Sequence, residues 1–145
     1  MSPSLNRSVA VLFMRLLLGL IFLMKGYGKV FTWGVEGLYN MEFFLGTYES
    51  LLPVWLIKLT AYYTSYIELI GGFLLIVGLK RNIVLYALGS VLVIVSFGHG
   101  LATPIWDLAA VMWRSVLLIG LLLLPEEWDR FSVDGVLKGF RKLRE

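Results

Sequence analysis

Four long apolar runs constrain this chain more than any other feature of its sequence. They cover residues 9–31, 57–79, 83–102 and 105–124. Each contains roughly the 20 residues that an α-helix needs to cross about 30 Å of hydrocarbon. Because Leu, Ile and Val follow one another without the alternation of a barrel strand, helices are the spanning structure that fits. The sequence predicts an all-α, integral membrane four-helix bundle formed by a single domain, residues 1–145.

Composition agrees with a lipid environment. Apolar residues make up 59% of the chain, which has only 13 basic and 10 acidic side chains. These charges could not cover four apolar runs in water, whereas a bilayer leaves the runs in contact with hydrocarbon. We therefore expect a multi-pass membrane protein with membrane lipid as a partner and no nucleic acid.

The basic residues outside the runs predict the orientation. If the chain crosses four times, they all fall on one side, and the opposite loops, residues 32–56 and 103–104, contain none. Cytoplasmic loops carry the excess of Lys and Arg, so both termini and the tail, residues 125–145, are expected in the cytoplasm. The residues concerned are Arg7, Lys80, Arg81, Arg130, Lys138, Arg141, Lys142 and Arg144.

Two segments outside the runs have helical periodicity. In the first loop, apolar residues recur at steps of three and four, which predicts a short amphipathic helix ended by Pro53. It is either a connector on the outer surface or an acidic lid over a pocket. The apolar positions are Leu38, Met41, Leu45, Tyr48 and Leu52.

The tail after Pro125 predicts a basic amphipathic helix. Its apolar face suits either the anionic inner leaflet or a soluble partner protein. That face comprises Val136, Leu137, Phe140 and Leu143, opposite Lys138, Arg141, Lys142 and Arg144.

The chain contains no cysteine and one histidine. Disulfides, thiolate nucleophiles and cysteine-ligated clusters are therefore excluded. No cluster of His and carboxylate residues has ligand spacing, so no metal site is predicted. The sequence contains no motif for a built-in cofactor. Binding of a quinone is the one cofactor hypothesis that stays open.

Ionisable residues within the runs are the best candidates for a site, because charges at membrane depth cost several kcal/mol unless they are paired or hydrated. Arg15, Glu68 and Arg114 lie about 9, 16 and 15 Å from the cytoplasmic ends of their helices. They are expected to form one buried ion cluster. Lys25, Lys29, His99 and Asp107 lie near the outer end and are expected to form a second, shallower polar layer.

Three interpretations of these charges stay open. Glu68 with Arg114 or Arg15 could be a structural clasp between helices. The excess of cations could instead bind an anionic head group or an oxyanion. A proton or ion path is the third. His99 is either an interfacial hydrogen-bonding residue or a ligand for a quinone-like carbonyl.

Two segments resemble a known family. RLLLGLIFLMKGYGKVF (Arg15 to Phe31) and YIELIGGFLLIVGL (Tyr66 to Leu79), separated by a loop that contains LLPVW, are similar to the DoxX family of small four-helix membrane proteins. The matching positions are Arg15, Gly19, Gly26, Lys29, Glu68, Gly71, Gly72 and Gly78.

The resemblance implies a bacterial or archaeal cytoplasmic (inner) membrane protein. Relatives include the small subunit of thiosulfate:quinone oxidoreductase and membrane parts of oxidative-stress assemblies. Thiol-oxidising chemistry, known in related four-helix proteins, is removed here by the absence of cysteine.

The leading functional hypothesis is an accessory protein of a redox or stress-related membrane system. It would hold an anionic or quinone-like ligand, or a membrane or peripheral redox partner, through Arg15, Glu68 and Arg114. One alternative is a quinone-linked oxidoreductase subunit that positions substrate with Lys25, His99 and Asp107. Another is a membrane assembly or chaperone-like protein. Whether the chain is an enzyme stays open, and a homo-oligomer is compatible with its short helices.

Overall fold

The computed structural model describes residues 3–103 and 109–142, and every regular element in these ranges is a helix. The all-α prediction is therefore confirmed. The α-helices are α1 (Pro3–Tyr27), α2 (Val35–Tyr39), α3 (Val54–Val77), α4 (Arg81–Ala102), α5 (Ala109–Leu123) and α6 (Val133–Lys142). Between them lie two π-helical turns, η1 (Gly28–Thr32) and η2 (Glu42–Gly46), and a 3-10 turn, η3 (Glu126–Trp128).

Three segments of the described residues are long and apolar enough to cross a membrane: Ser4–Thr32, Val54–Val77 and Arg81–Ala102. They correspond to the first three predicted spans. In α5 the apolar helix Val111–Leu123 is shorter, and part of the predicted fourth span, 105–124, lies outside the described residues. The fourth crossing and the cytoplasmic termini therefore stay predictions.

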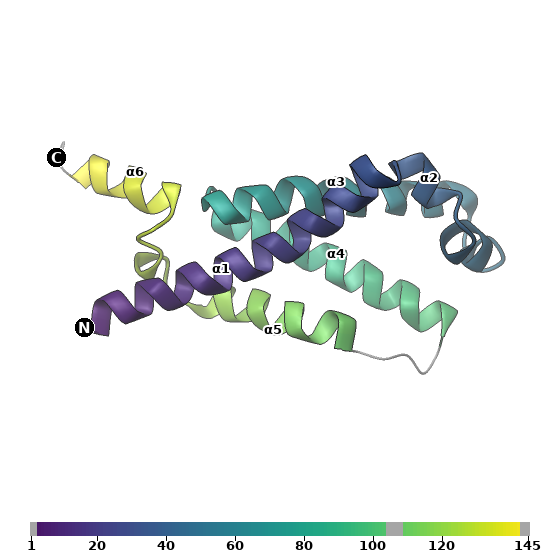
Figure 1. Ribbon diagram of the computed structural model, residues 1–145. Coiled ribbons are helices and arrows are strands. Elements are labelled where there is room, and N and C mark those ends of the chain that lie inside the picture. The colour runs from purple at the N-terminus through teal and green to yellow at the C-terminus, as the bar shows by residue number, and fades with distance from the viewer. Residues whose placement is uncertain (1–2, 104–108, 143–145) are drawn as a thin grey trace.

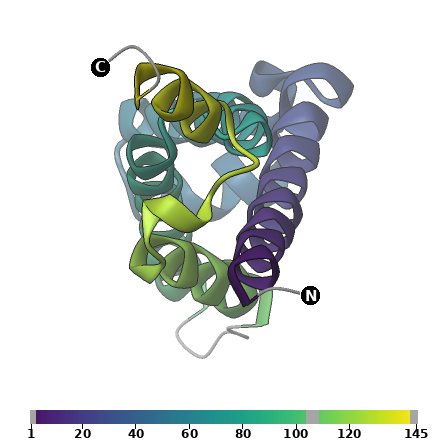
Figure 2. The ribbon, with the colours of Figure 1, turned by 90° about the vertical axis from the view of Figure 1, so that its left-hand side faces the viewer.

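The long helices pack side by side along one axis (Figure 1). α1 packs most extensively against α3, α3 also packs against α4, and α5 contacts both α1 and α4. The two ends of the chain lie at the same end of the bundle (Figure 1). Viewed from that end, α1, α3, α4 and α5 surround a common interior (Figure 2).

The interior of the bundle is mainly apolar. Its buried side chains come from all four long helices and include Val11, Leu18, Phe22, Leu75, Leu85, Leu88, Leu118 and Leu121. The outside also carries large apolar side chains: Val93, Trp113 and Leu123 are 69–79% exposed. In water this large apolar surface would be unfavourably hydrated, whereas in a bilayer the lipid acyl chains cover it.

Glycines allow α1 and α3 to approach closely. A Cβ atom on Gly26 would lie 2.2 Å from the backbone nitrogen of Leu69, and one on Gly72 would lie 2.3 Å from that of Leu23. Small residues permit such contact between helices in lipid. Gly26 and Gly72 therefore lie at the interface of α1 and α3, and this contact brings Glu68 next to α1.

The first loop differs from the prediction of one amphipathic helix. It forms two short helical segments, α2 and η2, because Met41 between them has an extended backbone (φ −67°, ψ 143°). α2 is still held against α3, since Val35 and Tyr39 are buried in a cluster with Ile57 and Ala61. Pro53 precedes the first residue of α3, as predicted.

Candidate functional site

Glu68 lies on the inner side of α3, and only 2% of its side chain is exposed. Lys29 Nζ lies 2.6 Å from Glu68 Oε2. Lys29 belongs to the π-helical turn η1, which continues α1 with a wider winding and so changes the direction of the side chains that follow Tyr27. This turn and the close contact at Gly26 together place the Lys29 ammonium beside the carboxylate.

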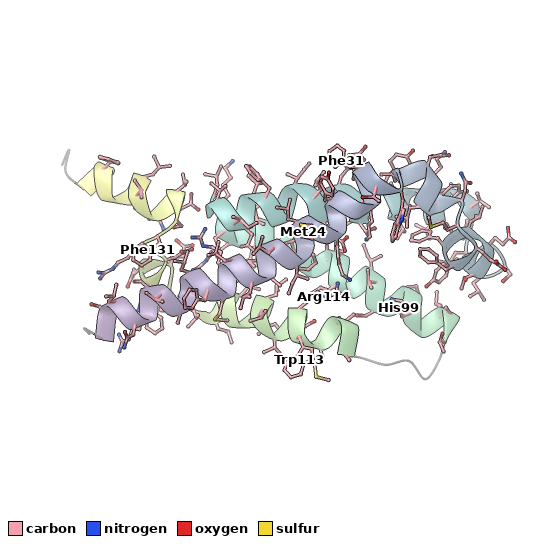
Figure 3. All side chains as sticks on the ribbon, viewed as in Figure 1. Met24, Phe31, His99, Trp113, Arg114 and Phe131 are labelled. Carbon is pink, nitrogen blue, oxygen red and sulfur yellow. The ribbon has the colours of Figure 1, made fainter. Side chains whose placement is uncertain are left out.

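Two further cations lie within range of charge–charge interaction. Lys25 interacts electrostatically with Arg114, Glu68 and Lys29, and Arg114 interacts with Glu68. Arg114 is 6% exposed, and its side chain points from α5 toward the other helices, whereas the neighbouring Trp113 points away (Figure 3). We call Lys25, Lys29, Glu68 and Arg114 the Glu68 group.

Among the described residues, the Glu68 group contains three cations and one carboxylate. Arg114 is almost fully buried, while the Lys29 side chain is 20% exposed and Lys25 is exposed at the edge of the group. An anion can therefore approach the group from the side of the lysines.

Arg15 has different partners. Its guanidinium is 1% exposed, and Nε lies 3.3 Å from Asp129 Oδ1. Nη1 donates hydrogen bonds to the carbonyl oxygens of Leu75 (3.1 Å) and Ile76 (2.7 Å), and Nη2 donates to that of Phe131 (2.7 Å). A cation at the end of α3 adds donors to the last carbonyl groups of the helix and is favoured by the helix dipole.

Asp129 connects Arg15 to a second arginine. Arg81 Nη1 lies 3.7 Å from Asp129 Oδ2, and its Nη2 donates to the carbonyl oxygen of Leu124 (2.9 Å). Burial raises the pKa of the Asp129 carboxyl, while the two guanidinium groups oppose that rise. We call Arg15, Arg81 and Asp129 the tail network, because it holds the segment after α5 against the bundle.

The single cluster of Arg15, Glu68 and Arg114 expected from the sequence is thus divided between two places. Glu68 lies against Gly26, which follows Arg15 by eleven residues and so by about 16 Å along α1. That distance is too large for a direct ion pair. The signal that was missed is Asp129, one of five acidic residues in a tail that also carries five basic residues.

The outer polar layer is also rearranged. Lys29 pairs with Glu68, and Lys25 lies in the same group, so neither belongs to a separate shallow layer. His99 is exposed on α4, nearer than Arg114 to the end of the bundle opposite the termini (Figure 3). Asp107 lies outside the described residues.

A polar contact holds the outer loop to the bundle. Glu36 in α2 accepts hydrogen bonds from Tyr62 (2.7 Å) and from Lys58 (2.9 Å), both in α3. These donors lower the pKa of the Glu36 carboxyl. The predicted connector is therefore attached to α3 by a charged pair as well as by apolar packing.

Comparison with known families gives a match that includes the two helices, α1 and α3, from which these contacts are built. The DoxX family model matches residues 10–100, which include α1, the outer loop, α3 and most of α4. No curated protein and no solved structure matches the chain at a significant level. Since the match extends over more than half of the sequence and includes Arg15, Lys29 and Glu68, the chain belongs to the DoxX family.

Proposed function

We propose that this protein is an accessory subunit of a redox or stress-related system in the cytoplasmic membrane, and that its Glu68 group binds a small anionic or quinone-like ligand. The observation that supports the proposal is that Lys25 lies exposed beside the Lys29–Glu68 pair and makes no ion pair among the described residues. Both termini are placed in the cytoplasm by the positive-inside rule.

The physical reason is the cost of unbalanced charge in a bilayer. Cations within a span cost several kcal/mol unless they are paired or hydrated. Lys29 is paired with Glu68, whereas Lys25 beside them makes no ion pair within the part of the chain that the structure describes, so a further negative or strongly accepting group is favoured beside Lys25. A guanidinium and an ammonium together suit an oxyanion, a quinol anion or the carbonyl of a quinone.

A structural clasp between helices and a ligand site can both be formed by the Glu68 group. Glu68 and Lys29 join α3 to the end of α1, and this pair supplies the fixed geometry that a binding site needs. Small residues on helix faces are what a membrane assembly role would use for partner helices, and Gly19, Gly26 and Gly72 are already in contact within the chain, between α1 and α3. An assembly function would therefore need another surface.

Native mass spectrometry tests the proposal, on protein extracted from its own membrane in mild detergent. We expect an anionic or quinone adduct on the unaltered protein and its loss in Arg114→Gln. Lys25→Gln, at an exposed position of the group, should weaken retention without threatening the fold. The matched control is Lys58→Gln, which removes a cation paired with Glu36 on the outer side.

The adduct's mass and absorbance would distinguish a quinone from an oxyanion. An unaltered protein without any adduct would contradict the proposal. So would an adduct that persists in both Lys25→Gln and Arg114→Gln while both variants unfold at the same temperature as the unaltered protein.

A further inference from the structure

A groove lies between the last residues of α3 and the tail. It has a volume of about 400 Å³ and is lined by Val77, Val133, Val136 and Leu137, with Phe131 beside them and Arg130 among its polar residues. Its walls are thus mostly apolar, with one cationic side chain.

Hydrogen bonds and ion pairs attach the walls of the groove to the bundle. Arg15 holds the carbonyl of Phe131, and the tail network holds Asp129. The backbone nitrogen of Asp134 donates to the carbonyl of Gly78 (3.1 Å), and its carboxylate accepts from the backbone nitrogen of Arg81 (3.3 Å). The first turn of α6 is therefore attached to the α3–α4 turn, and its apolar face has a defined position.

That apolar face continues the outer surface of α3. Ile70 and Phe73, 53% and 56% exposed, precede Val77 by seven and four residues and so lie on the same side of the helix. On α6, Val136, Leu137 and Phe140 are 52–64% exposed. Since the outer surface of a spanning helix contacts acyl chains, the continuous apolar surface identifies lipid as the occupant.

Charge complementarity indicates that the lipid has an anionic head group. Arg130 is exposed beside the groove and makes no hydrogen bond or ion pair within the described ranges. The sequence places further cations, Arg141 and Lys142, on the same tail. Basic residues next to a span attract anionic lipid by about 1 kcal/mol each.

From these observations we propose that the groove binds an anionic phospholipid of the adjacent leaflet. One acyl chain lies against Val77, Val136 and Leu137, and the phosphate lies at Arg130. This site is separate from the Glu68 group and does not depend on the function proposed for it.

The absence of cysteine allows a spin label to be attached at a single introduced cysteine. Labels at Leu137→Cys and, as a matched control, at Lys138→Cys on the polar face would be compared in vesicles of phosphatidylcholine and phosphatidylglycerol (3:1). We expect the Leu137 label to collide mainly with oxygen and the Lys138 label mainly with a water-soluble nickel chelate. Equal exposure of both labels to the chelate would overturn the proposal, as would a Leu137 label shielded from both reagents, which indicates a protein partner.

A second measurement tests the head group. Delipidated protein would be titrated with phosphatidylglycerol and followed by native mass spectrometry. Arg130→Gln should lower the affinity about fivefold, the change that corresponds to about 1 kcal/mol per basic residue. Lys80→Gln, an exposed cation outside the groove, should change it little. Equal losses in both variants, or no loss in Arg130→Gln, would contradict the site, and neither outcome bears on an adduct at the Glu68 group.

Discussion

Two buried charges on neighbouring helices of this protein have different kinds of partner. Glu68 is paired with a lysine from a π-helical turn at the end of α1. Arg15 is satisfied by three backbone carbonyl groups and one carboxylate from the tail. In both cases a contact remote in sequence offsets the desolvation of the charge.

Neutralising Glu68 tests its role at the residue scale. Glu68→Gln keeps the shape of the side chain but leaves the Lys29 ammonium without its counter-charge. We expect the free energy of unfolding to fall by about 3 kcal/mol, the loss typical of a broken buried ion pair. Denaturant unfolding in detergent measures it. Glu36→Gln, whose pair with Lys58 is exposed, should have a much smaller effect, and equal effects would contradict the clasp.

The outer contact predicts a pH dependence. The pKa of Glu36 is lowered chiefly by the hydrogen bond from Tyr62 and then by Lys58. Its contribution to stability is therefore complete above the ordinary glutamate pKa of about 4.3 and is lost as the pH falls through the lowered value. Tyr62→Phe should raise the pKa of Glu36, measured by carbon NMR of the labelled carboxyl. Tyr63→Phe, which removes a hydroxyl bonded to Ser90 instead, should leave it unchanged.

At the scale of the elements, the crossing of α1 and α3 depends on glycine. A methyl group on Gly26 would meet backbone atoms of Leu69 at 2.2 and 2.5 Å, and a backbone cannot move aside as a flexible side chain can. Gly26→Ala should therefore separate the two helices and disturb the Lys29–Glu68 pair as well.

We expect Gly26→Ala to lower the free energy of unfolding by about 3 kcal/mol, the upper end for overpacking a close contact. Thermal unfolding in detergent measures the change. Gly139→Ala in α6 is the control, because among the described residues no atom other than those of its chain neighbours and of its own helix backbone lies within 4 Å of the added Cβ, and alanine favours a helix. Unfolding of Gly26→Ala at the original temperature would show that the helices cross elsewhere.

At the scale of the whole molecule, the tail network joins α1 and the α3–α4 turn to the segment after α5. Arg15→Gln leaves Asp129 with Arg81 as its remaining cation and removes the Arg15 hydrogen bonds to the carbonyl groups of Leu75, Ile76 and Phe131, and we expect a loss of about 3 kcal/mol or more. Because Arg15 and Asp129 act together, Arg15→Gln with Asp129→Asn should cost less than the sum of the two single changes. Chemical unfolding of the four proteins gives this coupling.

Proteolysis supplies an independent measurement of the same network. Cleavage after Arg130 should be faster in Arg15→Gln than in Lys138→Gln, whose pair with Glu126 lies on the surface. If the tail of Arg15→Gln resists protease like the unaltered protein, the network does not hold it.

Orientation is a property of the whole chain and can be tested with cysteine variants. A membrane-impermeant maleimide should label Glu49→Cys in intact cells and Lys138→Cys only after permeabilisation. The reason is the concentration of basic residues at the end of the bundle that carries the termini. Labelling of Lys138→Cys in intact cells would reverse the predicted topology.

The apolar runs and the family were readable from the sequence because both depend on local features. Length and hydropathy decide that 57–79 and 83–102 are spans, and the helices observed there begin and end within three residues of the predicted limits. Helical periodicity alone also places Glu68, Gly71 and Gly72 on one side of α3, and all three residues are buried in the structure.

The partners of the buried charges were decided only by the tertiary structure. Arg15 and its acceptor Phe131 are 116 residues apart, and no periodicity relates them. The break at Met41 and the π-helical turn at Lys29 are further departures from ideal helices that a pattern of apolar residues does not record. Hydrophobicity selected the helices, because burial from water acts on each segment separately. The pairing of charges depended on how those helices cross and where the tail returns, because an ion pair needs both groups within a few ångströms of each other.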